Sequence, residues 1–224
     1  MRFPLYTIAV AVVAMLSVAC TNDSYDSGDG NFSYLTAEMV LLHTGSDMKA
    51  VSATTDSGES LTIANPFAQN WMTTPDTVYR ALLYYDRTGL QEVKARSVTR
   101  VPVLHALDAS RVADLDDSPV GLESVWHTDG SDYVNISLLL KSGKAEGDNL
   151  QTIALVDDGT TADGSGKRHM RLRVVHDQGS VPEYYTVRQY VSICLTDYAQ
   201  ADSVDISLNT AGAEVVRTFP CKRK

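Results

Sequence analysis

The sequence predicts an all-β protein, and three observations support this fold class. From residue 34 onward, most segments alternate apolar and polar residues with a period of two, which is typical of half-buried strands. No long segment has the 3.6-residue apolar spacing of an amphipathic helix. The predicted strands fall into groups of five and six on either side of an acidic, proline-containing segment. We therefore expect two β domains.

Composition limits the size of the core and the choice of partners. The chain has 224 residues, of which 44% are hydrophobic, enough for one large domain or two small ones. Its formal net charge of −9 disfavours nucleic acid as a partner, because nucleic-acid binding depends largely on neutralising phosphates. Three cysteines are too few for a disulfide scaffold.

Residues 1–19 are predicted to be a lipoprotein signal peptide. Arg2 supplies a positive start, Pro4–Leu16 is an uncharged apolar run, and small residues ending in Ala19 precede Cys20. The alternative is an N-terminal anchor helix. It is disfavoured because the run is shorter than the roughly 20 residues of a membrane span and no basic stop-transfer cluster follows.

The tetrapeptide "SVAC" resembles the lipobox that the lipoprotein signal peptidase cuts, although Ser17 stands where leucine is usual. The resemblance implies cleavage between Ala19 and Cys20 and lipidation of Cys20. Several acyl chains on one cysteine would anchor the protein stably in a membrane.

Residues 20–33 are predicted to be a flexible, acidic tether, because they contain charged and small polar residues but almost none that form a core. Asp23, Asp26 and Asp29 resemble a loose form of the acidic patch that marks some Gram-negative lipoproteins for surface export. We therefore expect lipid anchoring in the outer membrane of a Gram-negative bacterium, on the cell surface or the periplasmic face.

The first domain, 34–107, is predicted to contain five strands, with a hairpin turn at Asp56–Gly58 and a loop between the third and fourth strands. A linker follows at 108–121. The five strands are Tyr34–Thr44, 47–55, 59–64, Thr77–Asp86 and Leu90–Leu107.

The second domain, 122–224, is predicted to contain six strands at near-regular spacing with turn signals between them, a pattern typical of a β-sandwich. The six strands are 132–141, 149–156, 169–177, 184–195, 203–208 and 214–219.

Two segments of the second domain resemble the NigD-like envelope lipoproteins: "ESVWHTDGSDYVNISLLLKSG" (Glu123–Gly143) and "EYYTVRQYVSICL" (Glu183–Leu195). The resemblance implies an OB-like barrel for the first domain, an immunoglobulin-like sandwich for the second, and a role in bacteriocin immunity. The residues that match the family's pattern are Trp126, Tyr133, Asn135, Tyr184, Tyr185, Arg188 and Tyr190.

The charged residues suggest several sites that we consider less probable than solvent-exposed strands and turns. An OB-fold binds oligonucleotides with aromatic and basic residues on its second and third strands, where this chain offers only Lys49. Two basic stripes could bind anionic glycans or lipid head groups, but we favour the interpretation that they are the solvated faces of half-buried strands, because antiparallel sheets commonly have one such face. The stripes are Lys94, Arg96 and Arg100, and His169, Arg171 and Arg173.

No cofactor or metal is expected. Segment 155–168 lacks the lysine spacing and following helix of a phosphate-binding loop. Asp157, Asp158 and Asp163 could hold Ca²⁺, but a hairpin loop rich in Asp and Gly explains them better. The histidines form no defensible ligand set, and no catalytic motif appears, so we do not expect an enzyme.

The aromatic residues are interpreted mainly as packing residues. Trp126 is expected in the core or at the seam between the domains. By strand parity, Tyr185 should face inward, whereas Tyr184 and Tyr190 should share the opposite face with Arg188.

Two cysteines remain after Cys20. Cys194 and Cys221 could form a disulfide in an oxidising compartment or be unrelated thiols, and the sequence leaves both alternatives open.

The predicted function is that of a non-enzymatic, lipid-anchored envelope protein that binds a protein or a glycan. The resemblance implies the alternative of a bacteriocin-immunity or stress-related accessory lipoprotein. A further alternative is a divergent hydrolase with an unrecognised site. Nucleic acid is not an expected partner, and the oligomeric state is open.

Overall fold

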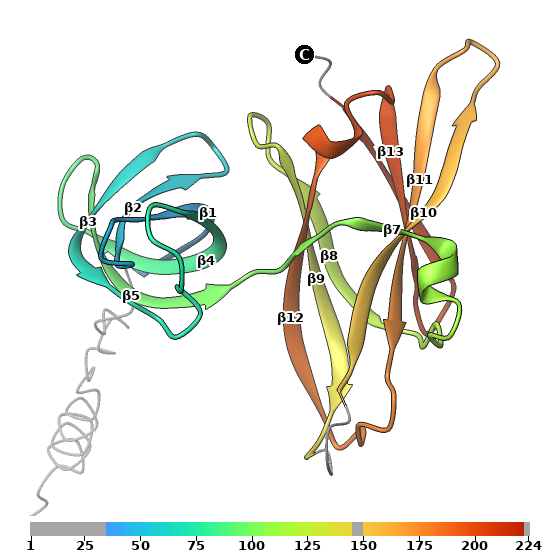
Figure 1. Cartoon of the computed structure of the whole chain (residues 1–224), viewed down its shortest axis with the longest axis horizontal. Helices are drawn as coiled ribbons and strands as arrows, with labels where there is room; N and C mark the ends of the chain where they lie inside the picture. Colours follow the sequence, from blue (N-terminus) through green and yellow to red (C-terminus); the bar gives the residue numbers. More distant parts are fainter. Residues whose placement is uncertain (1–34, 145–149, 222–224) are drawn as a thin grey trace, which may run out of the picture. The chain divides into compact units, whose positions relative to one another are not determined.

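The computed structural model describes residues 35–144 and 150–221, and in these ranges it is built almost entirely of strands (Figure 1). The strands form a closed five-stranded barrel and two further sheets of five and four strands. The described helices are two short 3-10 turns, η1 (Ala109–Val112) and η2 (Leu195–Tyr198). No helix within these ranges is long and apolar enough to span a membrane. The predicted all-β class is confirmed.

The barrel contains the five strands predicted for the first domain. Around it the strands follow the order β1-β2-β3-β5-β4, and β4 pairs with β1 to close the ring. β3 and β5 run parallel, while the other neighbouring pairs are antiparallel. This closed barrel agrees with the OB-like expectation. The strands are β1 (Thr36–Thr44), β2 (Ala50–Thr55), β3 (Ser60–Phe67), β4 (Val78–Arg87) and β5 (Glu92–Arg100).

The turn between β2 and β3 lies where the sequence predicted it. Gly58 has a φ of +86°, in the left-handed region that glycine adopts without steric cost. Its position after Asp56 and Ser57 therefore allows the chain to reverse tightly between two strands.

The chain leaves the barrel earlier than predicted. The single strand expected over Leu90–Leu107 is divided into β5 in the barrel and two short strands of the other sheets, β6 (Val103–Leu104) and β7 (Ala106–Asp108). Pro102 has no N–H to continue the β5 ladder. Its carbonyl instead accepts a hydrogen bond from the N–H of Ser192 on β12.

The predicted linker, 108–121, consequently lies along the sandwich rather than between two domains. It starts at the end of β7, which pairs with β10. Further along, the N–H of Ser118 donates to the carbonyl of His176, and the N–H of Val120 donates to the carbonyl of Asn209. These bonds hold against the sandwich an acidic segment that the sequence predicts to be a linker between domains.

The remaining strands form a sandwich of two sheets, ordered β14-β13-β11-β10-β7 and β6-β12-β9-β8, that share one apolar core. The alternating apolar residues of β9, β11, β12 and β13 supply most of this core. All six predicted strands are present: β9 (Tyr133–Ser142), β10 (Thr152–Ala162), β11 (Arg168–Asp177), β12 (Tyr185–Cys194), β13 (Ser203–Asn209) and β14 (Glu214–Pro220).

The sequence did not predict β8 (Gly121–His127), an edge strand that pairs with β9. A Cβ on Gly121 would lie 2.8 Å from the Cβ of Leu139, so glycine permits the close approach of the two strands. An edge strand has a neighbouring strand on one side only. Its side chains are less uniformly buried, so the alternation of apolar and polar residues that predicts a strand is weaker.

Candidate functional site

Both faces of β4 are buried, and this places Arg80 outside the barrel core. Leu83 and its odd-numbered neighbours pack inside the barrel. Leu82 packs on the other side, in a cluster that includes Trp126 of the sandwich. Arg80 shares the parity of Leu82 and therefore also faces the sandwich.

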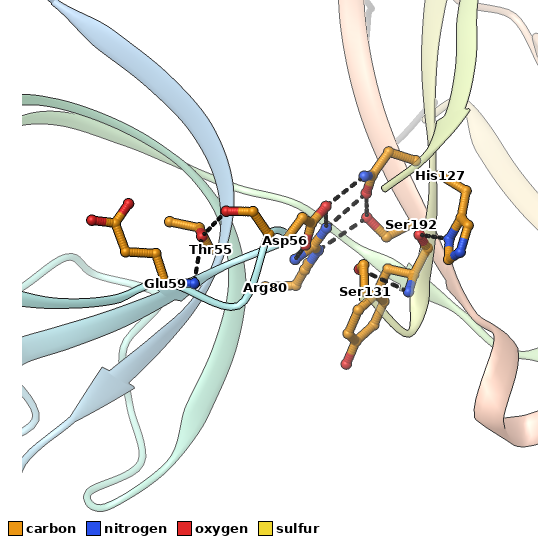
Figure 2. A network of polar contacts seen from close by, with 10 residues as sticks. Thr55, Asp56, Glu59, Arg80, His127, Ser131 and Ser192 are labelled. Carbon is orange, nitrogen blue, oxygen red and sulfur yellow. Dashed lines mark hydrogen bonds and ion pairs between the residues drawn. The ribbon is translucent and has the colours of Figure 1, made fainter. Parts of the chain in front are cut away.

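Arg80 is the centre of a buried polar network between barrel and sandwich, shown in Figure 2. Its guanidinium donates to both carboxylate oxygens of Asp56 at 2.6 Å, to Oδ1 of Asn135 at 2.8 Å and to Oγ of Ser192 at 3.3 Å. The guanidinium carbon lies 4.5 Å from the centre of the Tyr133 ring. The side chain is 1% exposed, so the protein replaces nearly all of its hydration.

Asn135 completes the network from the sandwich side. Its Nδ2 donates to Asp56 at 2.8 Å, and its Oδ1 accepts from both Arg80 and Ser192. Asn135 and Ser192 are opposite each other in the β9–β12 ladder, which fixes their side chains side by side. A buried network whose members all have partners specifies one arrangement. The Tyr-x-Asn pattern of the sequence therefore helps to join the barrel to the sandwich.

Trp126 and Tyr190 also lie at this seam, as the sequence allowed for Trp126. Their rings meet edge to face, with centroids 6.4 Å apart and an interplanar angle of 90°. Both pack against Met39, Leu82 and Val101 of the barrel side. Tyr190 is thus half-buried rather than free on an exposed face.

The other residues of the aromatic strand do not reach the seam. Arg188 forms a bidentate ion pair with Glu123, at 2.5 and 2.6 Å. Tyr184 is 80% exposed and Tyr185 is 55% exposed. The prediction that Tyr185 faces inward was wrong, because it is the first residue of β12 and lies beyond the packed part of the sheet, although Val191 and Ile193, of the same parity, are buried.

A cleft of about 340 Å³ opens beside the network, and we call it the seam cleft. Aromatic and apolar side chains make up one part of its lining, and carboxylates and hydroxyls make up the rest. No lysine or arginine is among the described residues that line it. The lining residues used below are Tyr84, Trp126, Tyr190, Glu38 and Asp56.

Glu38 is oriented by a tyrosine from inside the barrel. The hydroxyl of Tyr85 donates to Oε2 of Glu38 at 2.5 Å. Burial, followed by the carboxylate of Glu38, raises the pKa of Tyr85 far above its ordinary value. The phenol therefore remains a donor to Glu38, whose side chain shares with Leu83 the face of the sheet that is directed to the barrel interior.

The predicted basic stripes are the outer faces of strands. Lys94, Arg96 and Arg100 are exposed on β5, and Arg96 pairs with Asp86 at 2.5 Å. On β11, Arg173 pairs with Asp158, while the intervening apolar residues are buried. Both stripes are therefore described by the interpretation that they are the solvated faces of half-buried strands.

The acidic loop is a hairpin end, as expected. Asp163 accepts from the hydroxyl of Ser165 and from the N–H groups of Lys167 and Ser165, and these bonds strongly lower its pKa. Asp157 accepts from the N–H of Gly159. No group of three or more His, Cys, Asp or Glu side chains that could hold a metal occurs within residues 35–144 and 150–221.

One arrangement has the outline of a catalytic triad. Nδ1 of His169 lies 2.8 Å from Oγ of Ser203, and its Nε2 lies 3.5 Å from Asp163. Ser203 is only 8% exposed, and the second contact is at the limit of a hydrogen bond. The three side chains connect β13 to the β10–β11 hairpin.

Cys194 and Cys221 are both free thiols in the structure. Cys194 lies 3.1 Å from Oγ1 of Thr196, whereas Cys221 belongs to the sandwich core. Burial raises the pKa of the Cys221 thiol. The structure thus corresponds to the alternative in which Cys194 and Cys221 are unrelated thiols.

The remaining predicted site residues lie outside the described residues. These are Ala19 and Cys20, at the predicted cleavage and lipidation site, and Asp23, Asp26 and Asp29 of the tether.

Sequence reasoning missed Arg80, Asp56 and Glu38. A signal for Arg80 existed, because "VYRALLYY" is apolar on both faces of one strand with a single arginine between them. Such a strand is buried on both sides, and its charged residue then needs a partner. Asp56 was interpreted only as a turn residue.

Fold and site together define a β protein made of a closed barrel, a two-sheet sandwich and a cleft lined from both. No family model and no curated protein matches the sequence. Solved structures do match, and they show which proteins have a similar fold.

The structure is similar to a NigD-like immunity protein from Bacteroides caccae, with a TM-score of 0.64 and 20% identity over 84% of this chain and 97% of that one. A protein of unknown function DUF1344 from Bacteroides vulgatus gives 0.62, with 18% identity over 83% of this chain and 90% of that one. A protein from Parabacteroides distasonis, described provisionally as toxin related, gives a TM-score of 0.62, with 15% identity over 85% of this chain and 94% of that one. The resemblance found in the sequence is thus confirmed at the level of the fold.

Proposed function

We propose that the protein is a non-enzymatic binding protein of the cell envelope and that the seam cleft receives its ligand. The observation that carries the proposal is that both barrel and sandwich supply the walls of this cleft, beside a buried network that holds them together. Its volume of about 340 Å³ is within the usual range of ligand pockets. The lining offers ring surfaces and acceptors, which suit recognition.

The cleft offers recognition chemistry more readily than catalysis. Asp56 is engaged by Arg80 and Asn135, and Glu38 is engaged by Tyr85, so both carboxylates are held by neighbouring side chains. None of the three similar structures is described as an enzyme.

Site-specific photo-crosslinking tests the binding role. A benzophenone amino acid at Thr128, which lines the cleft, is compared with the same residue at Leu90, which is 91% exposed and does not line the cleft. We expect a discrete adduct in irradiated cells from Thr128 alone. Identical adduct patterns from the two positions, or none from Thr128, would contradict the proposal.

A second candidate is bacteriocin immunity, favoured by the fold shared with the NigD-like immunity protein. In this form of the proposal, the ligand is a toxin that the protein captures in the envelope. Deletion of the gene should then increase sensitivity to a toxin encoded nearby, and complementation should reverse the effect. Unchanged sensitivity would eliminate this candidate while leaving the binding role intact.

Anchoring through Cys20 is part of the proposal and rests on the sequence alone. Cys20→Ser should move the protein from the membrane fraction to the soluble fraction, and a variant that stays with membranes would refute lipid anchoring. Protease shaving of intact cells then tests the export patch. We expect the wild type to be shaved and a variant with alanine at positions 23, 26 and 29 to be protected.

A further inference from the structure

The sandwich has an open edge along β12. On one side, β12 pairs with β9 over its whole length. On the other side, the two-residue strand β6 pairs only with Ser192 and Ile193, near the end of β12. The chain then crosses to the other sheet, where β7 pairs with β10 (Figure 1). In the described part of the chain, no strand continues β6 along the rest of β12.

The register of β12 shows which backbone groups lie at this edge. The N–H of Ser192 donates to the carbonyl of Pro102, so the backbone groups of Ser192 are directed away from β9. Backbone direction alternates along a strand, and the β9–β12 ladder has no register shift, so Thr186, Arg188 and Tyr190 are directed to the same side. Among the residues that the structure describes, none accepts a hydrogen bond from these three N–H groups. They form a row of donors at the spacing of a strand.

Gln189 supplies a side-chain partner where a neighbouring strand would supply a backbone one. Its Nε2 donates to the carbonyl of Tyr190 at 2.9 Å. Gln189 lies opposite Leu138 in the β9–β12 ladder and shares the parity of Val191, so its side chain leaves the strand on the core face. A half-buried polar side chain at this parity indicates that the core is not closed along this edge.

A cleft of about 290 Å³ opens beside the unpaired edge, and we call it the edge cleft. Leu140 and Val191 of one sheet are buried members of the sandwich core that line it. Leu104 of β6 and Ile153 of the other sheet are half-buried and also line it. The described lining contains no charged side chain. The apolar core is therefore accessible at the place where the backbone edge is unpaired.

We propose that the open edge of β12 binds an extended segment of a partner protein, which pairs with Thr186–Tyr190 as an added strand and inserts an apolar side chain into the edge cleft. In strand addition, main-chain hydrogen bonds supply the affinity and pockets for alternate side chains supply the specificity. The uncharged lining disfavours a charged residue at the inserted position. The partner segment therefore alternates apolar and polar residues. This is a second site, because the edge cleft and the seam cleft share no lining residue.

Amide hydrogen exchange, followed by NMR on the chain from Thr21 onward, tests the edge in the free protein. We expect the amides of Arg188 and Tyr190 to exchange roughly a hundredfold faster than those of Gln189 and Val191, which pair with β9. Slow exchange of Arg188 and Tyr190 at every concentration would show that another part of this chain covers the edge. Slow exchange only at high concentration would show that a second copy covers it. Either result would overturn the assignment to a partner protein.

A synthetic strand tests binding at the edge. The probe is the peptide acetyl-KTVSVTVSK-amide, added in 0.3 M NaCl to screen the charges of its lysines. We expect it to slow the exchange of the Arg188 and Tyr190 amides, and a peptide with serine in place of each valine to bind at least tenfold more weakly. Absence of protection by the valine peptide, or equal binding of the two peptides, would refute the proposal.

N-methylated peptides test whether the backbone is recognised. One peptide is methylated at the nitrogens of its valines, and the other at the nitrogens of its inner serines and threonine. Because alternate N–H groups of a strand point to opposite sides, one methylated set faces β12 and the other faces solvent. We expect one of the two peptides to lose at least tenfold in affinity and the other to bind within about twofold of the parent. Equal affinities would exclude strand addition.

Two matched variants connect binding to the edge cleft. Gln189→Glu places an uncompensated carboxylate in the cleft, and we expect at least a tenfold loss of peptide binding. Gln91→Glu adds the same charge at an exposed position of the barrel outside the cleft and should change binding less than twofold. Equal losses would show a general charge effect and would refute the site. Circular dichroism checks that both variants fold, and the methylated peptides decide the matter on the wild type if Gln189→Glu does not.

Discussion

Arg80 in the barrel and Asn135 in the sandwich, 55 positions apart in the chain, are joined by a hydrogen bond of 2.8 Å, and both also bind Asp56. Arg80 is almost completely buried, so its charge is tolerated only because these partners surround it. The contact between barrel and sandwich therefore depends on a few buried hydrogen bonds, because water does not reach Arg80 to take the place of a lost partner.

Arg80→Met should destabilise the protein by about 3–5 kcal/mol, because it leaves the carboxylate of Asp56 buried without its cation. Urea denaturation followed by circular dichroism measures the loss. Combining Arg80→Met with Asp56→Leu should recover a large part of it, since replacing both members of a buried ion pair by apolar residues costs much less. A loss below about 1 kcal/mol for the single variant would show that the pair is not structurally important.

Gly121→Ala should destabilise the sandwich, because the new methyl group would lie 2.8 Å from Cβ of Leu139 and 3.0 Å from its carbonyl oxygen. We expect a cost of about 1–3 kcal/mol in thermal or urea unfolding, as is usual for overpacking. Gly164→Ala is the matched control, because a Cβ there meets nothing within 4 Å. Similar stability of the two variants would argue against the tight β8–β9 contact.

His176 should make stability depend on pH. It is 2% exposed, its Nε2 has no hydrogen-bond partner in the described residues, and burial lowers its pKa despite the opposing effects of the Ser118 carbonyl, Asp177 and Asp117. The unfolded chain binds the proton at a higher pH than the folded one. Stability is therefore lost as the pH falls below the ordinary histidine pKa of about 6.5.

The measurement is the free energy of unfolding between pH 7.5 and pH 5 for the wild type and for His176→Phe. We expect a smaller decrease on acidification in the variant. His105→Gln serves as control, because the side chain of His105 is 72% exposed, and it should keep the wild-type slope. Parallel curves for the wild type and His176→Phe would refute this source of acid sensitivity.

The two cysteines of the sandwich should react as separate thiols. In protein beginning at Thr21 and secreted to the periplasm, denaturation without reductant should allow alkylation of both Cys194 and Cys221. In the folded protein Cys221 should react far more slowly, because it is buried and its pKa is raised. Mass spectrometry counts the labels, and protection of both cysteines in the denatured sample would reveal a disulfide.

Local patterns were sufficient to predict most of the strands. The alternation in β1, β5 and β11 identified them, and Gly58 marked the β2–β3 turn. These features depend on neighbours in sequence: side chains on a strand alternate between two faces, and a tight turn needs a residue that accepts a positive φ. The all-β class followed from them.

The seam and its cleft could not be found in the same way. Asp56 and Arg80 are 24 positions apart, and Asn135 is 79 positions from Asp56, yet the three bind one another. Which outward-facing residues of a strand reach solvent and which reach another sheet depends on where the chain crosses between the sheets. The chain crosses at Pro102, before the acidic segment that suggested a linker. The sequence determined most of the strands and their faces. Only tertiary packing decided that Arg80 is buried and that Trp126 borders a cleft, because these outcomes depend on contacts between distant segments.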